Sequence, residues 1–341
     1  MRKSALLQEQ LKDEKVRCLT CQRHCVISPE NYGFCKTRFN EKGTLYTITY
    51  GLVSSLSNNP IEKKPLFHYF PGSIATTIGS KSCTFACPWC QNWEISKASG
   101  ENLEDSVEIM SPQQVLAFAQ RSGVQGLSVS FNEPTLSLEF ALELFELAAP
   151  EHLYCMFVTN GYMTADALRL LVKAGLTGAS VTIKGPADAV KRYCKADVEG
   201  VWQTVKLARQ LGVHIEIVSL VIPGINDDEA FLQAFARRIL TDLGIDTPVH
   251  FTRYFPAYEF TTPPTPIKTL EVARDLALDI GLRYSYLGNV PGHPYENTYC
   301  PACSQLLIKR YSSLSVESHL TADNRCPHCG ESIALFSSKN G

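Results

Sequence analysis

Three closely spaced cysteines are the residues of this chain best suited to do chemistry. Cys83, Cys87 and Cys90 lie in the segment GSKSCTFACPWCQNW, directly after a short run that is typical of a β-strand. Three thiolates at this spacing can bind three irons of a cubane iron–sulfur cluster and leave the fourth iron without a protein ligand. A cluster that only transfers electrons, or a closed zinc site, would need a fourth ligand nearby. The spacing therefore indicates an iron–sulfur centre with one iron open to a reactant.

Four cysteines near the carboxyl end form a second group. Cys300, Cys303, Cys326 and Cys329 occur in YCPAC and RCPHCGE, which are two knuckles with two residues between the thiols of each. Two knuckles can close a tetrahedron of four thiolates, so this group predicts a structural zinc ribbon, with a second iron–sulfur cluster as the alternative. A ribbon with little core would gain on the order of 10 kcal/mol of folding free energy from the metal.

A third group lies near the amino end, in CLTCQRHC and GFCKTR. Cys18, Cys21, Cys25 and Cys35 can bind zinc or an auxiliary iron–sulfur cluster, and their spacing alone does not choose between these. We favour structural zinc. His24 is expected to be a neighbour of this site and not a ligand.

The composition agrees with metal binding in a reducing compartment. The 341 residues carry a net charge of −2, and neither sign forms a long block, which argues against a nucleic-acid or membrane-surface role. No run approaches ~18 apolar residues, and the amino end lacks the apolar core of a signal peptide, so we expect a cytoplasmic protein. Its 13 cysteines are then unpaired, and only Cys155 and Cys194 stand outside the three groups, as expected core thiols.

The elements that must position the central cysteines alternate between strands and helices. Strands are predicted at residues 74–78, 126–130, 154–159, 178–183, 214–221, 249–253 and 282–287. Helices are predicted at residues 112–122, 136–148, 164–174, 201–211, 227–243 and 270–280. Such βα repetition demands a parallel sheet covered by helices, so the fold class is α/β, as an open or a closed barrel.

Two smaller regions flank this alternation. We expect an N-terminal Cys-rich region over residues 1–72 with a short charged helix ahead of the first cysteine group, a barrel over 73–295, and a zinc-ribbon-like domain over 296–341 with a strand at 306–311.

The central loop resembles the signature of the radical S-adenosylmethionine (SAM) enzymes, CxxxCxφC with an aromatic φ, here Trp89. The resemblance implies a 4Fe-4S cluster whose open iron chelates the amino and carboxylate groups of SAM, and one electron that cleaves SAM to a 5′-deoxyadenosyl radical. It also implies a partial (β/α)6, TIM-like barrel with the cluster loop after its first strand, where barrel active sites are built. Trp89 would then contact the cofactor.

Further segments resemble this family at the ends of successive strands. SFNEPT resembles the segment that usually reads GGEP, so Glu133 would accept a hydrogen bond from the methionyl amino group, although a carboxylate there would also cap the following helix. TNG places Asn160 beside the ribose and carboxylate, and IKG makes Lys184 a partner of the methionyl carboxylate or the substrate. The turn VIPGIND resembles the one that packs against adenine, with Asn226 or Asp227 capping the next helix.

Nearly the whole chain resembles the radical SAM enzyme of the AmmeMemoRadiSam system, which is similar to pyruvate formate-lyase activating enzymes. The resemblance rests on NPIEKKPLFHYFPGS, CPWCQNWEIS, LVIPGINDDE and GNVPGHPYENTYCPAC, together with both Cys-rich flanks. It implies association with Memo-like and AMMECR-like proteins and an electron donor such as flavodoxin or ferredoxin.

The substrate stays open between a small molecule and a glycine of a partner protein, as in a glycyl-radical activase. A function from another class is a metal-binding scaffold or interaction protein. Candidate residues for contact with a substrate at the barrel mouth are His68, Tyr69, His250, Arg253, Tyr254, Asn289 and His293.

Overall fold

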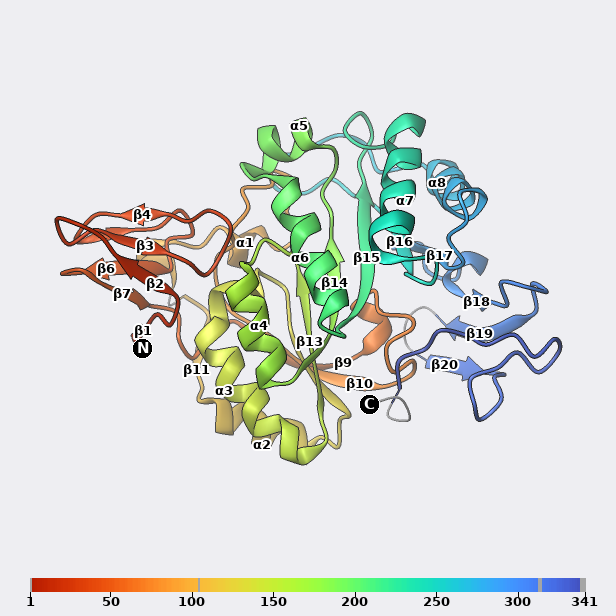
Figure 1. Cartoon of the computed structure of the whole chain (residues 1–341), viewed down its shortest axis with the longest axis horizontal. Helices are drawn as coiled ribbons and strands as arrows, with labels where there is room; N and C mark the ends of the chain where they lie inside the picture. Colours follow the sequence, from red (N-terminus) through yellow and green to blue (C-terminus); the bar gives the residue numbers. More distant parts are fainter. Residues whose placement is uncertain (1, 104, 312–314, 338–341) are drawn as a thin grey trace.

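The centre of the molecule is an open, mixed β-sheet (Figure 1). The computed structural model describes residues 2–103, 105–311 and 315–337. The sheet has eight strands in the order β17-β16-β15-β14-β13-β12-β10-β9. Its parallel strands are β10 (Ile74–Gly79), β12 (Gly126–Val129), β13 (Tyr154–Thr159), β14 (Leu176–Thr182), β15 (His214–Val221), β16 (Val249–Arg253) and β17 (Ser285–Gly288). The predicted α/β fold and its seven parallel strands are confirmed.

One further strand extends this sheet at its edge. β9 (Ser55–Pro60) pairs antiparallel with β10. Within the described residues β9 and β17 end the strand order without pairing to each other, so the barrel is open and not closed.

Helices connect the parallel strands and cover the sheet (Figure 1). They are α2 (Pro112–Arg121), α3 (Leu138–Ala148), α4 (Ala165–Ala174), α6 (Val198–Gln210), α7 (Glu229–Leu243) and α8 (Ile267–Asp279), with the short α1 (Trp93–Ser96) and α5 (Ala187–Ala189). Capping side chains fix where they begin, because the hydroxyl or carboxylate accepts a backbone N–H of the first turn. Ser111, Thr164, Asp197 and Asp228 serve in this way. Between helices and sheet lies one apolar core.

The N-terminal region consists of two small sheets. The first contains β2 (Gln8–Gln10), β3 (Val16–Cys18) and β4 (Val26–Ile27). The second has the order β1 (Lys3–Ser4), β7 (Thr44–Thr47), β6 (Arg38–Glu41) and β5 (Asn31–Tyr32). In addition, β8 (Leu52–Val53) pairs with β11 (Glu108–Ile109). The short charged helix predicted ahead of the first cysteine group is wrong. β2 turns back onto β3 through Asp13 and Glu14, whose φ angles of 57° and 55° end any helix, and this pairing overrides the local helix preference.

A buried ion pair joins this region to the barrel. Arg38 at the start of β6 donates to both carboxylate oxygens of Glu139 on α3, at 2.8 and 2.9 Å, and each side chain is 1% exposed. Glu139 also accepts the backbone N–H of Leu6 at 3.1 Å. Two segments of the N-terminal region are thereby fixed to one carboxylate of the barrel.

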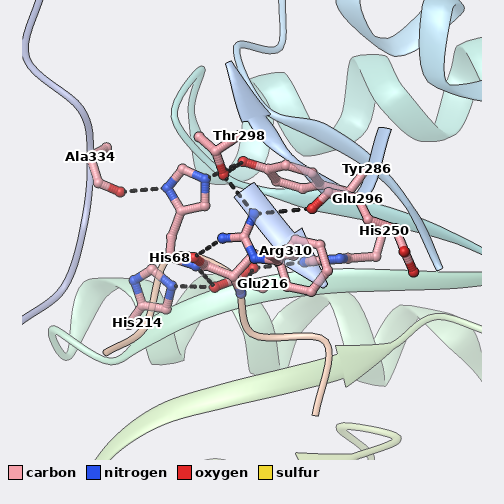
Figure 2. A network of polar contacts seen from close by, with 10 residues as sticks. His68, His214, Glu216, His250, Tyr286, Glu296, Thr298, Arg310 and Ala334 are labelled. Carbon is pink, nitrogen blue, oxygen red and sulfur yellow. Dashed lines mark hydrogen bonds and ion pairs between the residues drawn. The ribbon is translucent and has the colours of Figure 1, made fainter. Parts of the chain in front are cut away.

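The C-terminal region packs at the amino ends of the barrel strands. Its sheet contains β18 (Thr298–Tyr299), β19 (Leu306–Tyr311) and β20 (Ser315–Ser318), which confirms the predicted strand at 306–311. Arg310 of β19 is buried and donates to the carbonyl oxygen of Phe67 at 2.8 Å and to the hydroxyl of Thr298 at 2.9 Å (Figure 2). This arginine ties the C-terminal sheet to the segment that precedes β10.

Next to Arg310 lies a buried carboxylate at the amino end of β15 (Figure 2). Glu216 accepts the backbone N–H groups of Phe67 and His68 at 2.9 and 2.7 Å and hydrogen bonds from His214 and His250 at 3.1 and 2.7 Å. Burial acts to raise the pKa of Glu216, but these hydrogen bonds outweigh it and hold the pKa well below its usual range. The network therefore contains a fixed, ionised carboxylate.

Within the described residues, no helix combines the length and the apolar character that crossing a membrane requires.

Candidate active site

The carboxyl ends of the parallel strands surround one cavity of about 430 Å³ that opens to solvent. Its lining brings together the three central cysteines and the residues expected to bind the cofactor. They come from four successive strand ends: Cys83, Cys87, Trp89, Cys90, Glu133, Asn160 and Lys184. The parallel sheet explains this, because equivalent strand ends meet at one edge.

The cysteine loop follows β10 and is held by a side chain from the next strand end. Asn132 accepts the backbone N–H of Ser80 at 2.9 Å and donates to the carbonyl oxygens of Lys81 and Ser82, each at 3.1 Å. The residue before it, Phe131, has φ of 72°, a conformation that favours glycine. Asn132 therefore fixes the loop at a position where the related segment carries glycine.

The environment of the cysteines does not by itself favour thiolates. Burial, with the nearby Glu133 carboxylate, raises the pKa of Cys83 to about 12. The hydrogen bond between Cys87 and Cys194, with burial, raises the pKa of Cys87 well above its ordinary value. Metal binding must then supply the deprotonation, because a bound cation stabilises the thiolates at its ligand positions.

Glu133 is buried and aligned by four hydrogen bonds. Its Oε1 accepts from the N–H and hydroxyl of Thr135, at 3.1 and 2.6 Å, and from the hydroxyl of Thr159 at 2.7 Å. Its Oε2 accepts only the N–H of Asn160, at 2.9 Å, within the described residues. Burial raises the pKa of Glu133. The carboxylate does cap the short helix at Pro134–Ser137, and Oε2 keeps room for a further donor.

Asn160 connects this carboxylate to the cluster loop. Its side-chain amide donates to the hydroxyl of Thr84 at 2.9 Å and contacts the Sγ of Cys83 at 3.7 Å. The following Gly161 has φ of 70°, and an added Cβ would lie 2.8 Å from Val181. The TNG turn thus needs its glycine to bring Asn160 against the loop.

Lys184 follows β14 at the wall of the cavity, and no carboxylate pairs with its ammonium among the described residues. Its charge acts on the Cys87 thiol. Buried Asn226 supports this strand end by donating to the carbonyl oxygens of Leu220 and Lys184, at 2.9 and 3.4 Å. Asn226 therefore shapes the turn, whereas the cap of α7 is Asp228.

Trp89 lies in the cavity wall and is 2% exposed. Its ring contacts Tyr193 and Phe260 at centroid distances of 5.5 and 5.4 Å, and its indole N–H has no hydrogen-bond partner within the described part of the chain. A buried donor without a partner is costly, so a group bound in the cavity would satisfy it.

The residues present fit a 4Fe-4S cluster and its organic ligand. Three thiols lie on one loop, and within the described residues they do not converge to the distances of a single-ion site. An ordered carboxylate, an unpaired ammonium and a free indole donor line the same cavity. Cys83, Cys87 and Cys90 would hold the cluster, as the spacing predicts.

The residues expected at the barrel mouth lie elsewhere. His68 and His250 belong to the buried network at the opposite end of the sheet, so their prediction as substrate contacts is wrong. Tyr69 is buried too, where its ring stacks on Phe336.

The remaining mouth candidates satisfy their own loops and do not line the cavity. Arg253 donates to the carbonyl oxygen of Thr265 at 2.8 Å, Asn289 donates to that of Arg253 at 3.0 Å, and Tyr254 donates to that of Phe260 at 2.8 Å. His293 caps the turn at Pro294–Glu296.

Two cavity residues were missed by the sequence reasoning. Lys63 and Lys64 precede β10, and both line the cavity. Burial, with the charge of Lys63, lowers the pKa of Lys64 to about 8. The adjacent lysines just before the largely apolar run PLFHYF were the available signal.

The other two cysteine groups also gather in space. At the carboxyl end the Sγ atoms of Cys300 and Cys329 are 3.5 Å apart and those of Cys303 and Cys326 are 3.7 Å apart. All four lie within 4.8 Å of one another, which suits one metal ion. The N-terminal four line a separate cavity.

Comparison with known proteins agrees with this geometry. The Radical SAM superfamily profile matches residues 77–234. The chain is 41% identical over 335 residues to the uncharacterized protein MJ0808 of Methanocaldococcus jannaschii, covering 98% of this chain and 99% of that protein. It is 20% identical over 250 residues to GTP 3′,8-cyclase of Aquifex aeolicus, covering 66% and 75%.

A solved structure shares the fold. SuiB of Streptococcus suis bound to S-adenosylmethionine superposes with a TM-score of 0.51 at 11% identity, over 71% of this chain and 56% of that one. Since the profile covers the strands that carry the three cysteines, Glu133, Asn160 and Lys184, the chain belongs to the radical SAM superfamily and is an enzyme of that group.

Proposed function

We propose that this enzyme cleaves S-adenosylmethionine in the cavity at the strand ends and abstracts a hydrogen atom from a substrate bound beside it. The observation that carries the proposal is that three cluster cysteines, an ordered glutamate, Asn160 and an unpaired lysine line one cavity. When bound, a 4Fe-4S cluster with an open iron would supply the electron that converts SAM to methionine and a 5′-deoxyadenosyl radical.

The chain's own residues orient the cofactor. Glu133 accepts a hydrogen bond from the methionyl ammonium at Oε2, while Thr135 and Thr159 prevent the carboxylate from turning. Lys184 pairs with the methionyl carboxylate, since no protein carboxylate competes for it among the described residues. The turn that Asn226 braces packs against the adenine.

The two missed lysines indicate the class of substrate. Lys64 is 5% exposed, lies 4.8 Å from the Phe131 ring centroid and has no carboxylate partner within the described residues. A buried cation facing a cavity favours an anion. We therefore propose a small substrate with a carboxylate or phosphate group, and not a neutral glycyl backbone. Binding would weaken as the pH rises through about 8, where Lys64 loses its proton.

The C-terminal group is proposed to bind zinc. With Zn–S bonds of about 2.3 Å, a tetrahedral site places its sulfurs about 3.8 Å apart. The distances of 3.5 and 3.7 Å match that arrangement. Its role is structural, because Arg310 joins the C-terminal sheet to Phe67 at the amino ends of the barrel strands, whereas the cavity lies at their carboxyl ends.

The interaction partners remain predictions. The resemblance to the AmmeMemoRadiSam radical enzyme implies Memo-like and AMMECR-like proteins, with flavodoxin or ferredoxin as electron donor and a cytoplasmic location.

The test is SAM cleavage by the reconstituted enzyme. Protein loaded anaerobically with iron and sulfide, reduced and given SAM should release 5′-deoxyadenosine. Cys87→Ala should release none, whereas Cys155→Ala, a buried thiol remote from the cavity, should retain the activity. The proposal would be wrong if the loaded wild type released no 5′-deoxyadenosine, or if Cys87→Ala released as much as the wild type. Either result would favour a metal-binding scaffold.

The substrate class is tested by isotope transfer. Deuterium from an anionic metabolite should appear in 5′-deoxyadenosine, and Lys64→Met should raise the KM for that metabolite at least tenfold with little change in KM for SAM. Transfer from a deuterated glycine of a partner protein instead would identify an activase.

A further inference from the structure

The N-terminal cysteine cavity has no part in the chemistry proposed above. Cys18 ends β3, Cys21 and Cys25 flank the turn before β4, and Cys35 follows β5. All four line one small cavity. Cys18, Cys21 and Cys35 are buried and Cys25 is partly so. Four thiols from separate turns around one space indicate a metal centre.

The spacing of these sulfurs argues against a single zinc ion. Within the described residues, the C-terminal cysteines are the group in which three or more ligand atoms come within 4.8 Å of one another. No three of the N-terminal sulfurs do so, although all four face the same cavity. The sulfurs of Cys83, Cys87 and Cys90 are likewise not all within 4.8 Å of one another, in a family that carries a cubane cluster. A centre with several irons needs this wider spacing, because its ligands bind different corners.

The surroundings suit a centre with negative charge. Arg38 lines the cavity, its charge acts on Cys18 and Cys35, and its Nε has no hydrogen-bond partner within the described residues. The hydroxyl of Thr37 donates to the Sγ of Cys35 at 3.2 Å. Apolar Ile27 and Leu136 complete the wall. Buried donors directed at sulfur stabilise a thiolate-bound cluster and tune its potential.

The cavity adjoins the active site through one stretch of backbone. Cys83 lines the active-site cavity, while the next residue, Thr84, lines the N-terminal cavity. The hydroxyl of Ser82 donates to the carbonyl oxygen of Cys35, and Arg23 Nε donates to that of Thr84 at 2.8 Å. Consecutive Cα atoms are about 3.8 Å apart, so only the backbone of this one segment separates the two cavities.

We infer that Cys18, Cys21, Cys25 and Cys35 bind a second iron–sulfur cluster, ligated fully by protein, which relays single electrons to the cluster at Cys83, Cys87 and Cys90. This replaces the zinc expected from the sequence. The relay role rests on the proposed function, whereas the second cluster does not. A low-potential donor protein of the flavodoxin or ferredoxin class gives one electron to the second cluster. The second cluster is reoxidised when it passes that electron on, and no bond or proton changes at either centre.

The decisive experiment uses full-length protein that lacks the radical-cluster cysteines. Cys83→Ala/Cys87→Ala/Cys90→Ala is reconstituted anaerobically with iron and sulfide beside the wild type. We expect about four irons in the variant and about eight in the wild type. The variant should also show a dithionite-reduced paramagnetic signal that SAM does not change. Iron-free variant protein, with zinc at these cysteines, would overturn the inference.

Two controls keep the result interpretable. If the triple variant does not fold, the wild type decides the question, since its Mössbauer spectrum and iron content report two clusters or one. Cys155→Ala should retain about eight irons, because Cys155 lines neither cavity.

The relay is tested separately with Cys35→Ala. This variant should cleave SAM at a near wild-type rate with dithionite, a small reductant, but at least tenfold more slowly with reduced flavodoxin. The relay would be overturned if Cys35→Ala slowed SAM cleavage equally with both reductants, or with neither of them. If the wild type cleaves no SAM at all, the proposed function fails, while the iron content of the triple variant still decides the second cluster.

Discussion

The Sγ atom of Cys194 lies 3.3 Å from the Sγ atom of Cys87, in contact with a sulfur that we propose as a cluster ligand. Cys194 ends the π-helical turn Val190–Cys194 and is fully buried. The carbonyl oxygen of the same residue accepts the N–H of Ala86 at 3.0 Å, so the turn is fixed to the cysteine loop. When Cys87 is a bound thiolate, the Cys194 thiol is its donor.

This contact predicts a change in reduction potential. Removing a donor to a cluster thiolate disfavours the reduced, more negative state, so Cys194→Ala should make the potential more negative. Cys194→Ser keeps a donor and should stay closer to the wild type. A redox titration followed by electron paramagnetic resonance measures both. Loss of the cluster from Cys194→Ala would instead identify Cys194 as a ligand.

The Arg38–Glu139 pair predicts a large loss of stability on removal of one partner. Glu139→Ala leaves a buried, unpaired arginine, so the free energy of unfolding should fall by about 3–5 kcal/mol. Urea denaturation under anaerobic conditions measures it. The matched control is Glu41→Ala, which breaks the Arg2–Glu41 pair; its side chains are 55% and 42% exposed, and the cost should stay below about 1 kcal/mol. Similar losses for both variants would contradict the structure.

Because His68 is buried, we predict that the protein loses stability in acid. Its Nδ1 donates to the carbonyl oxygen of Ala334 at 2.8 Å, so in the neutral ring its Nε2 accepts from the hydroxyl of Tyr286 at 2.6 Å (Figure 2). Burial lowers the pKa of His68 from 6.5 to about 4. Between these values the unfolded chain binds the proton and the folded chain does not, so stability falls as the pH falls from about 6.5 toward 4.

The size of this effect is on the order of 2 kcal/mol between pH 7.5 and 5. The measurement compares the wild type with His68→Asn, which keeps a donor for Ala334 and removes the titrating ring. We expect a flatter stability profile for the variant over this pH range. Parallel profiles would show that His68 does not contribute.

The C-terminal cysteines predict a metal that can be removed without loss of the cluster. Cys329→Ala should lose about one equivalent of zinc and unfold at a lower temperature, because the ribbon has little apolar core of its own. Iron content and SAM cleavage should persist in the surviving folded fraction. Elemental analysis and thermal unfolding measure these, with Cys155→Ala as control. Iron in place of zinc at these four thiols would contradict the assignment.

Glu133 predicts a loss of cofactor affinity without a loss of cluster. Glu133→Gln retains the size of the side chain but not the charge that we propose pairs with the methionyl ammonium, so the Kd for SAM should rise tenfold or more. Its iron content should match that of the wild type. Unchanged affinity would remove Glu133 from the cofactor site.

The sequence was informative where the chemistry is local. The cysteine loop and the strand-end turns could be placed because parallel strands appear as separate apolar runs and their ends share one edge. The helix predicted ahead of the first cysteine group was wrong because the chain there forms β2, which pairs with β3. The local composition does not indicate that pairing.

Long-range neighbours were beyond local reasoning. His68 and Glu216 are 148 residues apart in the chain, yet a backbone N–H of one meets the carboxylate of the other at 2.7 Å. A histidine in a loop-like segment looks available for substrate until that partner is known. Lys64 was overlooked because nothing in its segment indicates contact with the active site. Only the folded structure shows that it lines the cavity.

The partner of Arg38 also constrains the order in which the nascent chain can mature. Glu139 is synthesised 101 residues after Arg38, so a ribosome-bound N-terminal segment has no counter-ion for this guanidinium. Enclosing the charge alone would cost several kcal/mol. The buried position of Arg38 can therefore form only after α3 has left the exit tunnel, and the N-terminal cysteines stay accessible during that interval.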